Sequence, residues 1–178
     1  MPLEKVAELI PDYAKDLRLN LTSLLRQTEL TEQQFWGSMV TCAMACRNGI
    51  LVEEILPEAA THLSPDAFAA AKSAAAVMGM NNIFFRFGHL SSNEKYRTMP
   101  SKLRMNVIRT HGANPVDFEL WCLAASAVNG CGTCVDSHEQ VVREKGISEE
   151  AVLAAVRVAS ILHGVATVLD TESFIESD

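Results

Sequence analysis

Apolar residues recur along most of the chain at the spacing of one face of an α-helix. Two such runs are Phe35, Met39, Ala43 and Cys46, and Val152, Ala155, Val158, Ile161 and Leu162. Intervals of three and four residues match the helical turn of 3.6 residues, and we find no convincing alternation of apolar and polar β-forming residues. The pattern predicts an all-α fold, with helices near residues 3–18, 31–47, 49–60, 64–79, 81–87, 101–109, 115–128, 131–145 and 148–168.

Helix-start signals mark the beginnings of several of these segments. Thr31, Ser64 and Ser148 each follow an apolar residue and precede acidic or amide residues, and Asn114 precedes a proline. A side-chain oxygen at such a position accepts a hydrogen bond from an unpaired backbone N–H, and acidic residues suit the positive end of the helix. These four residues are therefore predicted to be N-caps.

Three further features are expected to interrupt or end the helices. Pro11 and Pro57 should bend or split their segments, because proline lacks the backbone N–H and its ring clashes with the preceding turn. The polar residues 88–100 predict a loop. The acidic stretch 170–178 predicts a solvated tail.

Two stretches about fifty residues apart share a layout of cap, alanine-rich helix, glycine and next helix. The first begins at Ser64 and the second at Asn114, with a slip of one residue between them. Alanine-rich sequence produces such matches by chance, so a two-fold repeat of helical hairpins and a chance match both stay open. After the glycine, only the second stretch carries two cysteines, Cys131 and Cys134.

Composition and charge narrow the class of protein. With 178 residues, the chain is expected to form a single domain over residues 1–178. Apolar residues make up 48% but aromatic residues only 6%, which favours closely packed helices. The net charge of −7 argues against a nucleic-acid partner.

We see no signal-peptide core and no apolar run near the roughly 18–20 residues of a membrane span, so we expect a cytoplasmic protein without a membrane partner.

The candidate chemistry lies in the segment Cys-Gly-Thr-Cys-Val-Asp-Ser-His at residues 131–138. On a helix that opens after Gly130, Cys131, Cys134 and His138 fall within about 60° of one another, on one face. A helix N-terminus and a neighbouring imidazolium both favour the thiolate form of a cysteine. Two thiols one turn apart can close a disulfide, and a sulfenic acid formed by peroxide condenses with a neighbouring thiol. The segment therefore predicts thiol-dependent peroxide reduction.

The cysteines and histidines also allow other interpretations. A zinc site would need Cys46, Cys122 or His163 to complete it, because no second Cys-x-x-Cys and no His-x-x-x-His follows, and we expect no metal. A thioredoxin-like fold would need a strand before the motif. Cys42, Cys46 and Cys122 are expected to be small buried apolar residues, and His163 a core histidine or a pocket residue. The residues expected in the core or a subunit interface are Met78, Met80, Phe84, Phe85 and Phe87.

Several short motifs add a resemblance that spans nearly the whole chain. They are Tyr13-Ala14-Lys15-Asp16, Leu19-Asn20-Leu21, Met78-Gly79-Met80-Asn81-Asn82, Leu103-Arg104-Met105-Asn106, Phe118-Glu119-Leu120-Trp121, and Asn129-Gly130-Cys131 with His138-Glu139. In these motifs the chain resembles the alkylhydroperoxidase D (AhpD) family, within the carboxymuconolactone decarboxylase-like superfamily. The resemblance implies an all-α fold, a homotrimer, reduction of hydroperoxides, and re-reduction of a partner peroxiredoxin, AhpC.

The resemblance also implies roles for individual residues. Cys134 would form the sulfenic acid, while Cys131 would donate a proton, close the Cys131–Cys134 disulfide and engage the partner. His138 and Glu119 would form a proton relay. No cofactor would be tightly bound, and electrons would come from dihydrolipoamide or a lipoylated dehydrogenase component. Thr133 departs from the family, whose members carry histidine there, so no role of that imidazole is carried over.

Two other function classes stay open at this stage. One is a decarboxylase or lyase on the same helical fold, which would not need the cysteines. The other is a non-catalytic zinc or redox-sensing module. The sequence leaves open the preferred peroxide, the physiological electron donor, the balance between peroxide reduction and partner reduction, and the oligomeric state.

Overall fold

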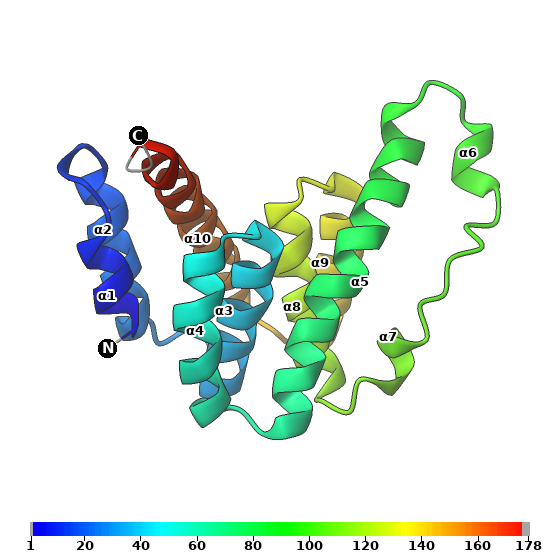
Figure 1. Ribbon diagram of the computed structural model, residues 1–178. Helices are drawn as coiled ribbons and strands as arrows, with labels where there is room; N and C mark the ends of the chain where they lie inside the picture. Colours follow the sequence, from blue (N-terminus) through cyan, green and yellow to red (C-terminus); the bar gives the residue numbers. More distant parts are fainter. Residues whose placement is uncertain (1, 176–178) are drawn as a thin grey trace.

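The computed structural model describes residues 2–175 and confirms the all-α prediction (Figure 1). Within that range the chain forms α-helices and two short 3-10 helices, and no strand. The elements are α1 (Pro2–Glu8), η1 (Asp12–Ala14), α2 (Lys15–Ser23), η2 (Leu24–Arg26), α3 (Glu32–Cys46), α4 (Gly49–His62), α5 (Pro65–Leu90), α6 (Lys95–Thr98), α7 (Val107–Thr110), α8 (Pro115–Val128), α9 (Gly132–Glu144) and α10 (Glu149–Ile175).

Helix α3 lies at the centre of the fold. It packs against α4, α5, α8 and α10, so residues around its whole circumference are buried. It lies so close to α8 at Gly37 that an added Cβ would be 2.1 Å from the ring of Trp121. The Trp121 indole donates a hydrogen bond to the carbonyl oxygen of Gln34 at 3.2 Å. A side chain at position 37 would therefore force apart the two helices that support the candidate site.

The predicted caps are confirmed. Thr31 accepts from the backbone N–H of Gln34, and the Gln34 side chain accepts from the Thr31 N–H, which is a complete capping box. Ser64 caps α5, and Asn114 caps α8 before a proline at the first helical position. Ser148 accepts from the N–H of Ala151 at 3.1 Å. Local sequence therefore defines where these helices begin.

The two prolines behave differently. Pro11 separates α1 from η1 and α2, so the segment predicted at residues 3–18 is split. Helix α4 instead runs through Pro57 without interruption. The short N-terminal helices lie at one edge of the fold, where α1 contacts α4 and α2 contacts α10 (Figure 1).

The predicted break between residues 79 and 81 is wrong. Helix α5 continues through Gly79 and ends at Leu90. The second alanine-rich stretch does break, at Gly130, which has a left-handed φ of +67°. Because the first stretch contains no corresponding turn, the repeat of helical hairpins is not confirmed.

Residues 83–110 form a projection that we call the arm. It consists of the outer part of α5, the short helices α6 and α7, and the irregular chain that joins them, and Figure 1 shows it extending away from the body. The predicted loop at 88–100 thus contains α6, and the helix predicted at 101–109 is reduced to α7. Arg97 ties α6 to α5 by donating from Nε to the carbonyl oxygen of Gly88 at 3.1 Å.

Helix α10 extends beyond its predicted end at residue 168. It reaches Ile175, so part of the expected acidic tail is helical, and residues 176–178 lie outside the described residues. Among residues 2–175, α10 alone is long and apolar enough to cross a membrane, contrary to the expectation that no such run exists. However, 61% of its most apolar window is buried inside the protein. It contacts α2, α3 and α8, as a core helix does.

Candidate active site

The turn between α8 and α9 positions the two cysteines of the motif. The left-handed conformation of Gly130 reverses the chain after α8, and the Cys131 N–H donates to the carbonyl oxygen of Ser126 at 3.1 Å. Cys131 is then the N-cap residue of α9, and Cys134 lies in its first turn. The predicted opening of a helix at the motif is therefore correct to within one residue.

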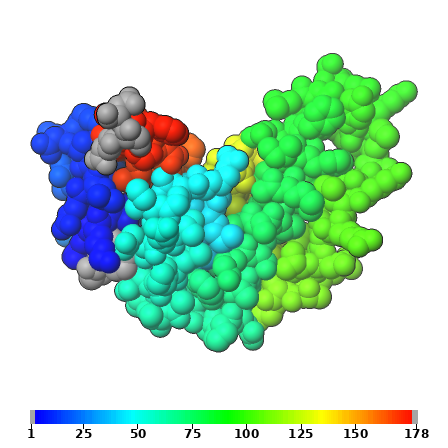
Figure 2. Space-filling model, in the orientation of Figure 1, coloured from blue at the N-terminus to red at the C-terminus, as the bar shows by residue number. Residues whose placement is uncertain are grey.

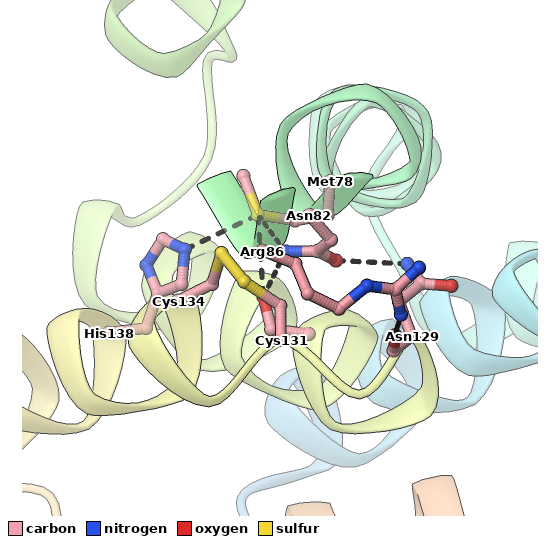
Figure 3. The surroundings of a disulfide bond; sticks show 8 residues. Met78, Asn82, Arg86, Asn129, Cys131, Cys134 and His138 are labelled. Atoms are coloured by element: carbon pink, nitrogen blue, oxygen red, sulfur yellow. Dashed lines mark hydrogen bonds between the residues drawn. A yellow bond between two sulfur atoms is a disulfide. The ribbon is translucent and has the colours of Figure 1, made fainter. Parts of the chain in front are cut away.

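Cys131 and Cys134 form a disulfide, with their Cα atoms 5.3 Å apart (Figure 3). The two residues differ in access to solvent. Cys131 has no exposed surface, whereas Cys134 is 7% exposed and lines a cavity. In this oxidised state, a small molecule that enters the cavity can reach only Cys134.

The structure brings His138 and Glu119 together. Glu119, on α8, accepts a hydrogen bond from His138 Nδ1 at 2.6 Å. Because an ionised carboxylate can only accept, Nδ1 carries a proton in this bond, and Nε2 is the ring nitrogen that faces the site. Nε2 lies 3.3 Å from the sulfur of Met78, with Cys134 beside the ring (Figure 3). Glu139, the residue after His138, instead lies near Arg143, at 3.8 Å.

A polar network behind the disulfide was not predicted. The Asn82 side chain donates to Ser126 Oγ at 2.9 Å and accepts from the Asn129 side chain at 2.9 Å. Arg86 donates to the carbonyl oxygen of Asn129, the residue two before Cys131. Figure 3 shows this chain of contacts joining α5 to the turn before α9. The sequence signals were the family motifs that contain Asn82 and Asn129, and the four-residue spacing of Asn82 and Arg86, which places both on one face of α5.

The cavity beside Cys134 has a volume of about 370 Å³. It lies between α5, α9 and the base of the arm, and its lining residues are Met78, Asn81, Phe85, Met105, Ile108, Thr133, Cys134, Ser137 and His138. Thr133 therefore does face the site. Asn81 is only 4% exposed, and its Oδ1 is buried without a hydrogen-bond partner among the described residues. The cavity is thus largely apolar, with polar groups near the sulfur.

The remaining cysteines lie outside this site. Burial raises the pKa of the Cys42 and Cys122 thiols well above its usual value, and it raises the pKa of Cys46 to about 11. Cys42 and Cys122 are buried as predicted, whereas Cys46 is only partly buried. In residues 2–175 no three His, Cys, Asp or Glu side chains are grouped as a metal ion would require, so the zinc alternative gains no support.

One other expectation needs correction, and for a second the structure separates core residues from exposed ones. His163 does not line the cavity of Cys134; it is exposed and lines a second cavity at the C-terminal end of α3. Of the apolar residues expected in the core or an interface, only Met78 is in the core, at 1% exposed. Met80, Phe84, Phe85 and Phe87 are 36–54% exposed in a single chain.

Comparison with known proteins identifies the family of the chain. The carboxymuconolactone decarboxylase family pattern matches residues 94–176, which include both cysteines and His138. Alkyl hydroperoxide reductase AhpD of Solibacter usitatus is 64% identical over 97% of this chain and 98% of its own length. The proteins of the same name from Acidobacterium capsulatum and Koribacter versatilis are 62% and 56% identical over 97% of this chain, and over 94% and 89% of their own lengths. Because these relatives align over nearly the whole chain, it belongs to the AhpD family of alkyl hydroperoxide reductases.

Proposed function

We propose that this protein is a thiol-dependent hydroperoxide reductase whose reactive groups are Cys134, Cys131, His138 and Glu119. One observation carries the proposal. Two cysteines close enough to form a disulfide lie at a helix start, and the outer one shares a cavity with a carboxylate-bound histidine. The names of the close relatives agree with peroxide as the substrate.

The proposed cycle begins with the reduced protein. The Cys134 thiolate attacks the outer oxygen of a hydroperoxide, ROOH, and the O–O bond breaks. The alkoxide leaves and takes up a proton to become ROH, while Cys134 becomes a sulfenic acid. The Cys131 sulfur then attacks Cys134, the S–O bond breaks, and water leaves. The product is the Cys131–Cys134 disulfide, the state that the structure represents.

His138 and Glu119 are proposed to move the protons of this cycle. With Nδ1 held as a donor to Glu119, the unprotonated Nε2 can accept the proton of a thiol. The imidazolium that forms is stabilised by the carboxylate and can return its proton to the leaving alkoxide. Glu119 acts through His138, so we regard it as a positioning residue.

Burial bears on which sulfur a reductant attacks first. The resemblance implied that Cys131 engages the partner, but Cys131 has no exposed surface in the disulfide form. We therefore propose that an external dithiol attacks Cys134, which lines the open cavity, and releases the Cys131 thiol. The second thiol of the donor then closes the donor's own disulfide and frees Cys134.

The cavity walls favour an organic hydroperoxide over a small polar one. Met78, Phe85, Met105 and Ile108 offer apolar surface to an alkyl or aryl group. The Oδ1 of Asn81 is a buried acceptor without a partner in the described part of the chain, and the O–H of a hydroperoxide can donate a hydrogen bond to it. Asn81 is therefore proposed to orient the substrate.

The electron donor, partner and assembly are further parts of the proposal. We propose dihydrolipoamide or a lipoylated dehydrogenase component as donor, AhpC as a protein that Cys134 and Cys131 re-reduce, and the cytoplasm as the location. A homotrimer is proposed to form through the arm. The supporting observations are the cavity beside Cys134, whose volume admits a small dithiol, and the exposed apolar residues of the arm.

Mass spectrometry of the reduced protein after one equivalent of cumene hydroperoxide tests the proposed cycle. We expect a Cys131–Cys134 disulfide in the wild type, and a sulfenic acid trapped by dimedone on Cys134 in the variant Cys131→Ser. Cys134→Ser should lose lipoamide-dependent turnover, whereas Cys122→Ser should retain it. Full turnover by Cys134→Ser would refute the proposal.

The decarboxylase or lyase alternative makes a different prediction. A lyase does not need the thiols, so it would keep its activity after both cysteines are alkylated. For the proposed reductase, alkylation of Cys131 and Cys134 in the reduced protein with iodoacetamide should instead abolish all turnover of hydroperoxide. The match to the carboxymuconolactone decarboxylase pattern is the observation that keeps this control worthwhile.

A further inference from the structure

A second cavity lies behind the redox centre, on the side of the disulfide opposite His138. Its volume is about 400 Å³, and its walls come from the C-terminal end of α3, the middle of α5, the end of α8 and His163 of α10. Figure 2 shows the surface hollowed between α10 and the outer part of α5, with the α8–α9 region at the floor. Cys134 and His138 do not line this cavity, so it is distinct from the proposed peroxide site.

The charge of this cavity is opposite to that of the protein. Arg47, Arg86 and His163 line it and none of its lining residues is acidic, although the chain as a whole carries a net charge of −7. The arginines that pair with carboxylates within residues 2–175 are Arg18, Arg143 and Arg157. The guanidinium groups of Arg47 and Arg86 therefore form no ion pair with a carboxylate of these residues. Such a concave surface concentrates anions.

One carboxylate acts electrostatically near the rim. Besides burial, the negative charge of Asp170 raises the pKa of the Cys46 thiol, so Asp170 acts at the C-terminal end of α3. Its Oδ1, however, accepts a hydrogen bond from the Asn48 side chain at 2.7 Å. Asp170 is thus held outside the set of lining residues and forms no ion pair with Arg47.

Much of the remaining cavity wall is apolar, and Asn129 adds one polar side chain. Met44, Ala75, Ala76, Ile83 and Val128 contribute hydrocarbon surface beside the arginines. A cavity of this size, lined by a few charged groups and by apolar side chains, is typical of sites for small amphipathic ligands. The planar guanidinium group matches a carboxylate through two parallel hydrogen bonds.

We propose that this cavity binds an organic anion that carries one carboxylate and a hydrocarbon chain. The carboxylate lies between Arg47 and Arg86, and the chain covers the apolar wall of α5 and α8. Inorganic phosphate would match the charge but leave that wall exposed to water. The proposal concerns binding alone and does not depend on peroxide reduction.

The site has a direct connection to the redox centre. Arg86 donates to the carbonyl oxygen of Asn129, and the Asn129 side chain donates to Asn82 at 2.9 Å. Gly130 and Cys131 follow Asn129 directly, and their N–H groups bond to Ala127 and Ser126. A carboxylate that engages Arg86 therefore acts on the residue that holds the turn before Cys131. Slower hydrogen exchange at the Gly130 and Cys131 amides is the expected consequence of binding.

Calorimetric titration of the full-length protein with octanoate tests the proposal. Octanamide keeps the chain but lacks the charge, and phosphate has the charge but lacks the chain. Both should bind at least about tenfold more weakly than octanoate, since each lacks one of the two matching groups. Arg47→Gln and Arg86→Gln should each weaken octanoate binding about tenfold. Arg26→Gln, on an exposed arginine outside the cavity, should leave it unchanged.

Several outcomes would overturn the proposal. One is that octanamide or phosphate binds as tightly as octanoate. Another is that Arg47→Gln and Arg86→Gln both keep the wild-type affinity for octanoate. A third is that octanoate binds only when the arm is disrupted, which would mean that a second copy of the chain fills the cavity. If Arg86→Gln fails to fold, Arg47→Gln carries the test alone. Cys134→Ser should bind octanoate normally, so a failure of the proposed peroxidase function would be seen separately.

Discussion

The contact between Glu119 and His138 illustrates how single residues control the proposed chemistry. The carboxylate accepts from Nδ1 at 2.6 Å, so Nε2 is the ring nitrogen that is turned toward the cavity and the Met78 sulfur. Glu119 comes from α8 and His138 from α9, so the turn at Gly130 is what brings them together. The effect of each group is therefore best examined with substitutions that keep its size.

Glu119→Gln should lower kcat/KM for an organic hydroperoxide roughly 10- to 100-fold, because the neutral amide no longer stabilises the imidazolium. The pH profile should shift as well, which a purely structural defect would not produce. Glu139→Gln is the matched control, since Glu139 lies near Arg143 instead of His138. Stopped-flow kinetics across a pH series gives both readouts. Wild-type kinetics in Glu119→Gln would contradict the proposed relay.

Asn81→Leu should raise KM for cumene hydroperoxide about tenfold while leaving kcat nearly unchanged. The reason is that leucine has a similar size but lacks the buried acceptor, whose hydrogen bond to the substrate is worth about 1.4 kcal/mol. Steady-state kinetics with lipoamide as the donor separates KM from kcat. A fall in kcat at constant KM would assign Asn81 a role other than substrate orientation.

The free cysteines should be much less reactive than the redox pair. Burial raises the pKa of Cys46 to about 11, so at pH 8 only about one molecule in a thousand carries its thiolate. Alkylation of Cys46 should increase about tenfold for each pH unit between 8 and 10, because the thiolate fraction rises until the pH passes the pKa. Peptide mapping after a short iodoacetamide pulse measures this dependence. Rapid labelling of Cys46 at pH 7 would contradict the burial of its thiol.

At the scale of elements, the packing of α3 against α8 supports the site. Gly37 allows the Trp121 ring to lie against the backbone of α3, and the indole N–H then reaches the Gln34 carbonyl. The same helix α8 carries Glu119, and it ends at the turn that leads into the cysteine motif. A change in the spacing of α3 and α8 would therefore displace Glu119 and the turn that leads into the cysteine motif.

Gly37→Ala should destabilise the protein by about 1–3 kcal/mol, because its Cβ would overlap the rigid indole ring. Gly79→Ala is the matched control in another helix interior, with nothing within 4 Å of an added Cβ. It should be neutral or stabilising by up to about 1 kcal/mol, as alanine favours the helix. Urea denaturation of both variants measures the difference. Equal stability of the two variants would argue against close packing at Gly37.

At the scale of the whole molecule, the arm has two surfaces. Phe85, Met105 and Ile108 form a wall of the cavity beside Cys134. Phe87 and Leu90 point elsewhere and are 54% and 79% exposed. Exposed apolar groups of this kind, gathered on one projection, are typical of an interface between subunits. In the proposed homotrimer, assembly and access to the cavity beside Cys134 therefore share one structural element.

Phe87→Glu combined with Leu90→Glu should convert the proposed trimer to a monomer, because charged groups cannot be buried unpaired in the interface. Light scattering coupled to size-exclusion chromatography measures the mass. The matched control combines Leu19→Glu with Leu153→Glu, which are 64% and 62% exposed but lie outside the arm. A wild-type mass for the arm variant would show that the subunits meet elsewhere.

The sequence alone determined features that depend on neighbouring residues. Caps at Thr31, Ser64, Asn114 and Ser148 were predictable because a cap needs only its own first turn. The shared helical face of the cysteine motif followed from the period of the helix in the same way. The family resemblance added Glu119, which no local pattern links to His138.

Only the tertiary structure decided which residues surround the motif. Helix α5 continues through Gly79 because packing against α3, α8 and α9 outweighs the preference of one glycine, and this continuity carries Asn81 and Asn82 to the site. The burial difference between Cys131 and Cys134 and the placement of Arg86 behind the disulfide depend on contacts between residues more than forty positions apart. Such contacts leave no periodic signal, because they arise from the packing of complete helices.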